Sequence, residues 1–263
     1  MIRNRFCKPT IVLASAFLTL AAALHAQGQP GPVTPAARVE QSPLDEPIGW
    51  LNEARRSYAV VKDYSCTLMS RERVRGDLLD VNVIQMKVKT QPFSIHMRWL
   101  DPKKSAGQEV AFVVGKHNNK MRVKSNVLGG KVIGFMSIDP QDPRVTDHSR
   151  HTILEAGIGN MIESTHRMWT SERTLGKALS KSTDYLCNQK ECHRVELTRT
   201  ERNPASYCFR TVVYLEKQSK LPIRLENYDW PRQGGPAEGD LLEMFSYVNL
   251  QFNTGLKDED FAK

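Results

Sequence analysis

The sequence predicts an α+β fold in which a curved antiparallel β-sheet, a half-barrel of about nine or more strands, wraps over a few helices. Apolar residues recur at helical spacing in only two segments, and they alternate with polar residues through much of the remaining chain. Short polar turns separate the alternating segments, so successive strands are expected to pair as antiparallel neighbours. A closed barrel would leave the apolar side of the first helix uncovered unless the helices closed its mouth, so we favour an open sheet.

The start of the chain (1–26) predicts a cleavable secretory signal peptide. Arg3 and Arg5 lie in a basic segment, 11–24 is an apolar run, and the small residue Ala26 precedes the expected cleavage site. A membrane anchor is the alternative, but this run of about 14 residues is shorter than the roughly 20 that a spanning helix needs. No cysteine directly follows the run, so we expect no lipoprotein acylation. These features predict a periplasmic or secreted protein without a transmembrane span.

Beyond the signal peptide, residues 27–44 are rich in Gly and Pro and predict a flexible linker, and 45–263 fits a single domain. The whole chain has a formal net charge of +8, and the signal peptide carries three basic and no acidic residues, which leaves +5 after cleavage. This moderate positive charge fits weak attraction to anionic lipid or polymer. We expect no nucleic-acid partner, because export separates the protein from nucleic acid.

An amphipathic helix of about four turns is predicted from Asp45, with Pro47 in its first turn. Its apolar residues recur at helical spacing: Trp50, Leu51, Ala54, Tyr58 and Val61. A second helix is predicted at roughly 151–168. Gly157 and Gly159 would weaken this helix but would also permit close approach to a neighbouring sheet.

The alternating segments predict nine strands. They are 64–69, 81–89, 93–99, 110–114, 121–123, 193–200, 207–215, 221–228 and 242–251. Between the fourth and fifth lies the pair Gly115-Lys116, which raises the question of a phosphate-binding loop. Such a loop needs Gly-x4-Gly-Lys-Ser/Thr leading into a helix, whereas here Val110 and His117 occupy the first and last defined positions. Asn118 tolerates the left-handed backbone conformation, so we predict a hairpin turn.

Four cysteines remain after signal-peptide removal: Cys66, Cys187, Cys192 and Cys208. In an oxidising compartment this even number permits two disulfides, with three possible pairings. Four polar residues between Cys187 and Cys192 predict a hairpin loop that brings these two to disulfide distance, and we expect this disulfide. Nothing in the sequence decides whether Cys66 and Cys208 meet. A zinc site that includes His193 is the alternative, but no Cys-x2-Cys pair supports it, so we expect no metal.

Catalytic motifs are scarce. Asp147, His148, His151 and Glu155 are close in sequence, and on a helix the last three would share a face that could hold a metal. We favour a solvated helix start, because no motif fixes the geometry. Glu109 could act as a general base, but no acid or histidine has a motif spacing to it, so we favour a structural role. The expectation is a non-enzymatic protein without catalytic residues or cofactors.

One apolar stripe could bind a ligand. Phe93, Ile95, Met97 and Trp99 point to one side of their predicted strand. Such a stripe usually belongs to the core. On a concave face that is only partly filled, the same four side chains could line a lipid-sized cavity, and they are our candidate ligand-binding residues.

Four segments resemble an exported bacterial family known as domain of unknown function 1571, over roughly residues 50–261. They are MRWLDPKKSAGQEVAFVVGKHNNKM, SIDPQDPRVTDHSRHTILEAGIGNMIE, KLPIRLENYDWP and FSYVNLQFNTGLKDEDF. The layout is more distantly similar to the periplasmic lipoprotein-carrier superfamily, in a first helix, a Trp-x-x-Pro strand followed by Gly, and a Leu-Pro strand before a closing strand. That resemblance implies a half-barrel over helices with an apolar cavity for acyl chains. No carrier motif for cargo-binding residues is visible, and Cys187 and Cys192 depart from the expected pattern.

Three hypotheses follow. The first is an exported binding protein that holds a lipid or acylated ligand, such as lipoprotein acyl chains, in an apolar cavity between sheet and helices. The second is a structural or signalling module of the cell envelope, whose core is filled by its own side chains and which meets an envelope protein partner. The third is a hydrolase of envelope material that uses Glu109 or the cluster around His151. Fold signals without catalytic signals favour the first.

Overall fold

The computed structural model describes residues 41–125, 134–203 and 206–263. The predicted signal peptide, and the predicted linker up to residue 40, lie outside the described residues. Residues 41–263 belong to one compact unit. In the described part of this unit, no helix has the length and apolar character that crossing a membrane requires.

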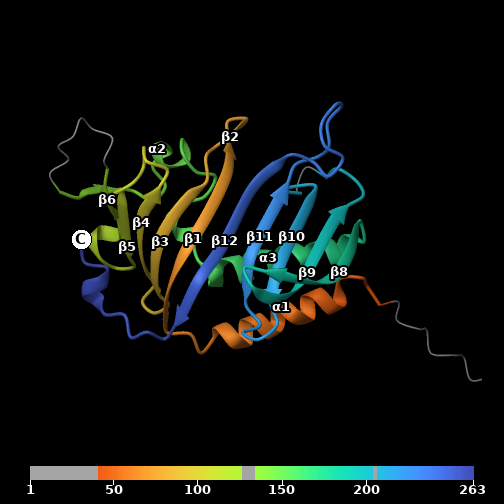
Figure 1. The fold of residues 1–263 in the computed structure, drawn as a ribbon, viewed down its shortest axis with the longest axis horizontal. Helices are drawn as coiled ribbons and strands as arrows, with labels where there is room; N and C mark the ends of the chain where they lie inside the picture. Colours follow the sequence, from red (N-terminus) through yellow and green to blue (C-terminus); the bar gives the residue numbers. More distant parts are fainter. Residues whose placement is uncertain (1–40, 126–133, 204–205) are drawn as a thin grey trace, which may run out of the picture. The chain divides into compact units, whose positions relative to one another are not determined.

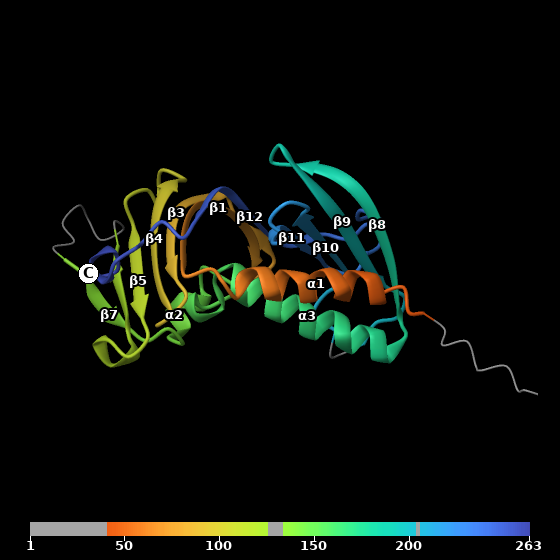
Figure 2. The same cartoon turned by 90° about the horizontal axis from the view of Figure 1, so that it is seen from below.

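Twelve strands of the described residues form one antiparallel sheet, and Figures 1 and 2 show that it is open and curved. The strands are β1 Asp63–Val74, β2 Asp77–Leu78, β3 Asn82–Lys89, β4 Ser94–Asp101, β5 Glu109–Val113, β6 Met121–Lys124, β7 Met136–Ile138, β8 Ala178–Cys187, β9 Lys190–Arg199, β10 Arg210–Glu216, β11 Pro222–Tyr228 and β12 Leu241–Phe252. Their order is β7-β6-β5-β4-β3-β1-β12-β11-β10-β9-β8, and β2 pairs with the end of β1. The predicted fold class, a curved antiparallel sheet of about nine or more strands over helices, is confirmed.

Two long helices, α1 Asp45–Tyr58 and α3 Ile158–Leu175, lie side by side across one face of the sheet, which we call the inner face (Figure 2). The shorter elements are α2 Pro143–Thr146, η1 His117–Asn119, η2 Ile153–Glu155 and η3 Asp258–Asp260. The predicted apolar side of α1 is confirmed, because Leu51, Ala54 and the following Val61 are buried. These side chains cover the inner face and remove its apolar surface from water.

The second predicted helix begins later than expected. The chain forms the short η2, and α3 starts only after Gly157, whose φ of 101° is unfavourable for residues with a side chain. A Cβ atom at Gly157 would lie 2.9 Å from the Tyr64 hydroxyl, and one at Gly159 would lie 2.5 Å from the Tyr58 ring. The two glycines therefore end one segment and let α3 approach α1 and β1 closely.

The core lies between the inner face and the helices. One apolar cluster runs from β6 to β9 and includes Val123, Met97, Leu68, Leu225 and Val195. Alternation with period two explains this, since β1 buries Tyr64, Cys66 and Leu68 on the inner face while the residues between them face outward. The layer is continuous across the central strands.

The turn between β5 and β6 carries no phosphate-binding geometry, as predicted. His117, Asn118 and Asn119 all have positive φ, and the Asn119 side chain accepts a hydrogen bond from the Gly115 backbone N–H at 2.8 Å. The flanking elements are strands, and residues 114–120 are exposed. The prediction of a hairpin turn at Gly115-Lys116 is confirmed.

The C-terminal segment crosses the opposite, outer face of β3 to β6. The Lys87 ammonium lies 2.6 Å from an Asp260 carboxylate oxygen, and the Arg122 guanidinium donates to the Lys263 carbonyl at 3.1 Å. Phe261 is buried at 1% exposure. The segment thus shields part of the outer face of β3 to β6, the face on which Glu109 of β5 lies.

Candidate functional site

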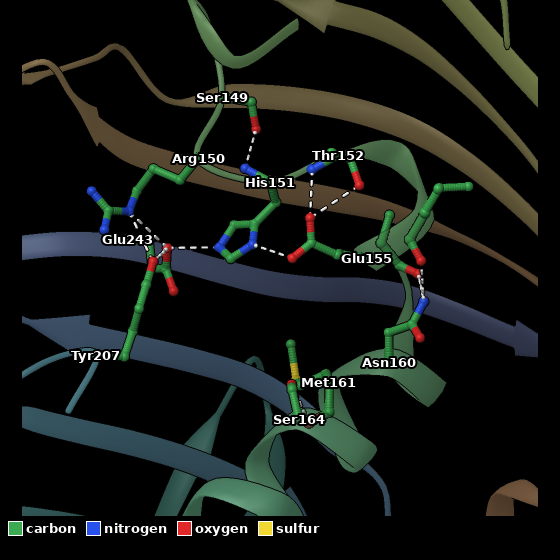
Figure 3. Close-up of polar contacts among 12 residues, drawn as sticks. Ser149, Arg150, His151, Thr152, Glu155, Asn160, Met161, Ser164, Tyr207 and Glu243 are labelled. Atoms are coloured by element: carbon green, nitrogen blue, oxygen red, sulfur yellow. Dashed lines mark hydrogen bonds and ion pairs between the residues drawn. The ribbon is translucent and has the colours of Figure 1, made fainter. Parts of the chain in front are cut away.

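A group of polar side chains, in which buried Glu72, Asn227 and Glu243 meet more exposed partners, lies at one end of the inner face. Strand register places Glu72 of β1 opposite Glu243 of β12, and Asn227 of β11 opposite Glu243 on its other side. The segment between α2 and η2 passes over this row and brings Arg150 and His151, and Tyr207 comes from the connection before β10 (Figure 3). We call these six residues the polar cluster: Glu72, Arg150, His151, Tyr207, Asn227 and Glu243.

Glu243 is the centre of the polar cluster, and four groups contact its carboxylate. The Tyr207 hydroxyl and the Asn227 amide donate at 2.6 and 2.7 Å. His151 Nε2 lies at 2.8 Å and Arg150 Nε at 3.3 Å. Burial by itself would raise the pKa of Glu243, but the hydrogen bond and charge of His151, with the bonds from Tyr207 and Asn227, outweigh burial and lower it. Glu243 is therefore a stabilised carboxylate.

His151 carries the complementary charge. Burial would lower its pKa, but the hydrogen bond and charge of Glu243, followed by the charges of Glu72 and Glu155, raise it to about 9. Its second nitrogen, Nδ1, lies 3.4 Å from a Glu155 oxygen. The imidazole is thus a cation at neutral pH, held between carboxylates.

Glu72 occupies a less favourable position. Burial raises its pKa, although the Arg150 backbone N–H donates to it at 2.7 Å and the Ser149 hydroxyl lies 3.1 Å from both oxygens. The neighbouring Glu243 charge acts in the same direction as burial. The cluster as a whole balances two carboxylates with Arg150 and His151.

Glu72, His151 and Glu243 each offer one ligand atom within 4.8 Å of the others, which is close enough to hold a metal ion. Arg150 and His151 already form ion pairs with Glu243. His151 would have to lose its proton to coordinate a metal. The donor set is satisfied without a metal. The cluster is accordingly best described as an ion-pair network that fixes the 147–155 segment on the sheet.

The predicted helix start at residues 147–155 is wrong, and so is the alternative in which His148, His151 and Glu155 share one helix face, because residues 147–152 are not helical. Asp147 pairs with Arg75, and His148 is exposed beyond the end of α2. Only His151 and Glu155 meet. Sequence reasoning missed Glu72 and Glu243, whose only signal was a carboxylate at an inward position of an alternating strand.

Glu109 has a histidine partner, which no motif spacing in the sequence indicated. His96 Nε2 lies 3.0 Å from Glu109 Oε2, and the Lys124 ammonium lies 3.4 Å from the other oxygen. Burial lowers the pKa of His96 despite this contact. The pair lies on the outer face of β4 and β5, the face crossed by the C-terminal segment, and it lines neither of the two pockets described for the chain. This placement fits a structural role.

The predicted ligand-lining stripe lies on the inner face. Ile95 and Met97 belong to the buried core, and Phe93 and Trp99 pack against it. Of the four, Phe93 also lines a pocket of about 270 Å³ beside the C-terminal end of α1 and the start of α3. The pocket is smaller than the roughly 300–1,000 Å³ of typical ligand sites. In this structure the chain's own side chains fill much of the interior.

Comparison with known proteins places the chain. A family model described as "Protein of unknown function (DUF1571)" matches residues 61–263. The chain belongs to the DUF1571 family. No curated protein matches this DUF1571 chain.

Several solved structures show a loose likeness. An uncharacterized conserved protein from Thermus thermophilus is 8% identical with a TM-score of 0.47, over 83% of this chain and 93% of that one. Lipoprotein LppX from Mycobacterium tuberculosis is 10% identical with a TM-score of 0.46, over 80% and 96%. A LolA superfamily protein from Nitrosomonas europaea is 11% identical with a TM-score of 0.35, over 82% and 96%. Because these scores are low, the functions of these proteins are not transferred to this chain.

The predicted disulfide between Cys187 and Cys192 is not formed in this structure of the DUF1571 chain. The four described cysteines are buried free thiols. The loop between Cys187 and Cys192 is shorter than expected: only Asn188-Gln189 form the turn, so Cys187 faces Lys190 and Cys192 faces Tyr185 across β8 and β9. The two cysteines are diagonal neighbours in one small cluster. The hydrogen bond from Cys192 lowers the pKa of Cys187.

Strand positions exclude two other arrangements of the cysteines. His193 lies on the inner face, where its ring stacks on Trp50 with 4.3 Å between the ring centroids. Cys192 packs on the other face, so the alternative zinc site with His193 is wrong. Cys66 is on β1, and Cys208 precedes β10, three strands away. Strand spacing separates them by roughly 14 Å, well beyond the Cα distance of a disulfide. Cys208 instead contacts Thr211 and Arg199.

Proposed function

We propose that this DUF1571 protein is an exported, non-enzymatic binding protein that holds a lipid or acylated ligand between the inner face and helices α1 and α3. The observation that carries the proposal is the continuous apolar layer across the inner face, from β6 to β9, beneath the two long helices of the described residues. An acyl chain placed there would gain roughly 0.8 kcal/mol per buried methylene group. Such a ligand needs no polar motif for its tail.

The composition of this layer supports adaptation to a ligand. Methionines contribute to it from both sides: Met86, Met97 and Met121 from the sheet and Met161 from α3. Methionine is unbranched and flexible, so it can repack around an irregular apolar molecule. We propose Phe93, Ile95, Met97 and Trp99 as residues that contact the ligand, with Phe93 at the entrance.

The contacts between the helices also support an opening at the pocket. Ion pairs hold α1 to α3 near both ends: Arg173 to Asp45 at 2.6 Å, and Arg55 to Glu163 at 2.8 Å. Both are partly exposed, and ion pairs of this kind contribute only about 0–1 kcal/mol each. Since the Arg55 pair borders the pocket, a small displacement of α1 there would join the pocket to the apolar layer.

A hydrolase that uses the polar cluster is the second candidate, favoured by the closeness of Glu72, His151 and Glu243. Against it, these groups neutralise one another through hydrogen bonds and ion pairs, which leaves no general base without a partner in the cluster. An envelope module with a self-filled core is the third candidate, favoured by the filled interior. The experiment below separates these from a carrier.

To test the proposal, the full chain is expressed with its own residues 1–26, recovered from the periplasm or medium, and purified without detergent. Native and denaturing mass spectra are then compared, and an organic extract is analysed for lipid. A mass excess that disappears on denaturation, with lipid in the extract, supports the carrier. A ligand-free mass, together with no binding of added acyl probes, would overturn it and favour the self-filled module.

A matched pair of variants locates the entrance. Phe93→Glu places a charge in the pocket wall, and it is expected to reduce the lipid recovered by tenfold or more because a buried carboxylate is strongly unfavourable. Val114→Glu is the control, since Val114 is exposed on the neighbouring hairpin and does not line the pocket. Equal lipid recovery from both variants would place the entrance elsewhere.

A further inference from the structure

Two polar atoms on the buried side of α3 have no hydrogen-bond partner among the described residues. They are the Thr165 hydroxyl oxygen and the Trp169 indole nitrogen. The residues are 1% and 0% exposed, so both groups are removed from water. A buried donor without a partner is unfavourable, and native structures contain few of them. The two donors lie one turn apart on one helix, so a single ligand group could accept hydrogen bonds from both.

The Thr165 hydroxyl does not donate to a backbone carbonyl of its own helix, although other hydroxyls of α3 do. In the same helix, the Ser164 hydroxyl donates to the Met161 carbonyl at 3.2 Å, and the Thr174 hydroxyl donates to the Thr170 carbonyl at 3.1 Å. Thr165 makes no such bond, although backbone carbonyls one turn back are within reach of helical threonines. Its hydroxyl is therefore available to a group outside the helix.

The position of the pair connects it with the pocket. Ile162, which lines the pocket, is also part of the buried core. Thr165 and Trp169 follow on the same side of α3, about 5 and 10 Å further along the helix axis. A ligand that enters past Ile162 and extends under α3 would meet the two donors in turn. The polar mouth of the pocket, with Asn160 and the Arg55–Glu163 pair, would remain at the ligand's outer end.

We infer that Thr165 and Trp169 bind the carbonyl oxygen of an acyl ester or amide, a step that rests on the proposed function. A carbonyl oxygen has two lone pairs, and the indole N–H and the threonine hydroxyl can each donate to it. The acyl tail then continues into the apolar layer. A plain hydrocarbon would leave both donors without partners.

The surroundings also distinguish an ester from a free fatty acid. Glu172 lies one turn beyond Trp169 on the same side of α3. The buried cation next to it, Arg199, is already used: its guanidinium donates to Glu172 at 2.5 Å and to the Cys208 carbonyl at 2.8 Å. A ligand carboxylate at this depth would be desolvated without a free cation and close to a like charge, which is strongly unfavourable. The site therefore selects a neutral carbonyl.

Three probes of equal chain length test this inference on the purified exported chain: a fatty-acid methyl ester, the free acid and the alkane. Each competes with a fluorescent apolar dye, and the competition gives relative affinities. The ester is expected to bind about tenfold more tightly than the alkane, the size expected of the hydrogen bonds gained. The free acid is expected to bind more weakly than the ester at neutral pH.

Variants assign the preference to residues. Thr165→Val keeps the shape and removes the hydroxyl, so the preference for ester over alkane should fall severalfold while alkane binding persists. Trp169→Phe, which removes the N–H, should act in the same direction. Thr174→Val is the matched control and should keep the full preference, because its hydroxyl is satisfied by the helix.

The outcomes distinguish the carbonyl site from the carrier function. Equal binding of ester and alkane by the unaltered chain, or a preference that survives in both Thr165→Val and Trp169→Phe, would overturn the carbonyl site and leave the carrier function standing. If none of the three probes displaces the dye, the carrier function itself fails, and the carbonyl site fails with it.

Discussion

Glu243 and Trp169 are both buried against the same inner face, yet they differ in the number of hydrogen-bond partners that their polar atoms have. The Glu243 carboxylate has four partners drawn from three separate segments of the chain. The Trp169 N–H has none in the described residues, and neither does the nearby Thr165 hydroxyl. One end of the face is thus a completed polar network, and the region under α3 is incomplete.

This difference indicates which buried polar groups of the inner face stabilise the fold and which are available to bind a ligand. A buried group whose partners are all supplied by the chain contributes to the folded state and has little left to offer a ligand. A buried group without a partner lowers the stability of the ligand-free protein and gains a partner only when something binds. We therefore expect substitutions in the polar cluster to change stability, and substitutions at Thr165 and Trp169 to change binding.

The largest effect is expected from Glu243→Leu. It removes the shared partner of Arg150 and His151 and leaves both cations partly buried, so unfolding free energy should fall by about 3–5 kcal/mol. Urea unfolding followed by circular dichroism measures this loss. Glu191→Leu is the control, since Glu191 is exposed on β9. Similar stability of the two variants would show that the cluster is not a stabilising network.

A pH dependence should follow from His151, whose folded-state pKa of about 9 exceeds its ordinary value of 6.5. Because the pKa is raised on folding, the stabilisation is fully present below pH 6.5 and is lost as pH rises from 6.5 through 9. Its size should be on the order of 2 kcal/mol, since the side chain is 30% exposed and solvent screens part of the effect.

Denaturant unfolding at about pH 6 and about pH 9.5 measures the His151 contribution. His151→Asn should remove most of the difference between the two pH values, and His148→Asn should keep it because His148 is exposed. A wild-type protein that is equally stable at both values would contradict the charged state assigned to His151.

The outer-face cluster around Cys187 and Cys192 extends the comparison, because here two buried groups are partners of each other. Both thiols are free in this structure, and we predict that they form a disulfide when the protein is purified under oxidising conditions, which lowers the mass by about two units. Reduction should then cost about 2 kcal/mol, as expected for a short closed loop. Denaturing mass spectra before and after reduction check this, with Cys192→Ser as control. Identical masses would show that the thiols stay free.

The smallest change in unfolding free energy is expected at Thr165, which lies on the buried side of α3. Thr165→Val removes a buried hydroxyl without a partner, so the ligand-free protein should gain about 1 kcal/mol in unfolding free energy. Thr174→Val removes a hydroxyl that has a partner and should bring no gain. Thermal unfolding of ligand-free samples measures both. A loss of stability in Thr165→Val would indicate that an internal water satisfies the hydroxyl, and the comparison with Glu243 would then fail.

Much of the fold could be predicted from local patterns. The alternation in 64–69 and 93–99, and the helical spacing from Trp50 to Val61, follow from which residues are buried. The start of α3 could not be predicted, because a helical apolar pattern gave no warning that Gly157 adopts a positive φ beside Tyr64. The strand at 178–187 escaped prediction because its residues are mostly exposed and show no apolar alternation.

The candidate sites depend on contacts between distant segments, which sequence patterns do not contain. Glu72 and Glu243 are 171 positions apart and meet only through the register of β1 and β12. His96 and Glu109 meet because neighbouring strands place them diagonally on one face. The inward direction of Phe93, Ile95, Met97 and Trp99 was predictable from period two alone. Their distribution between core and pocket depends on where α1 and α3 cross the sheet.

The pairing of β1 with β12 has a consequence for how the chain is made. A polypeptide emerges from the ribosome N-terminus first, so the strands β3 to β7 can assemble on β1 early, while the other side of β1 stays unpaired. β12 is the last strand to appear, and it alone joins this early half to β11 and the strands beyond it. The middle of the sheet is therefore completed last. Until β12 arrives, the nascent chain exposes an unpaired edge on β1, which any partner that keeps it unfolded could recognise.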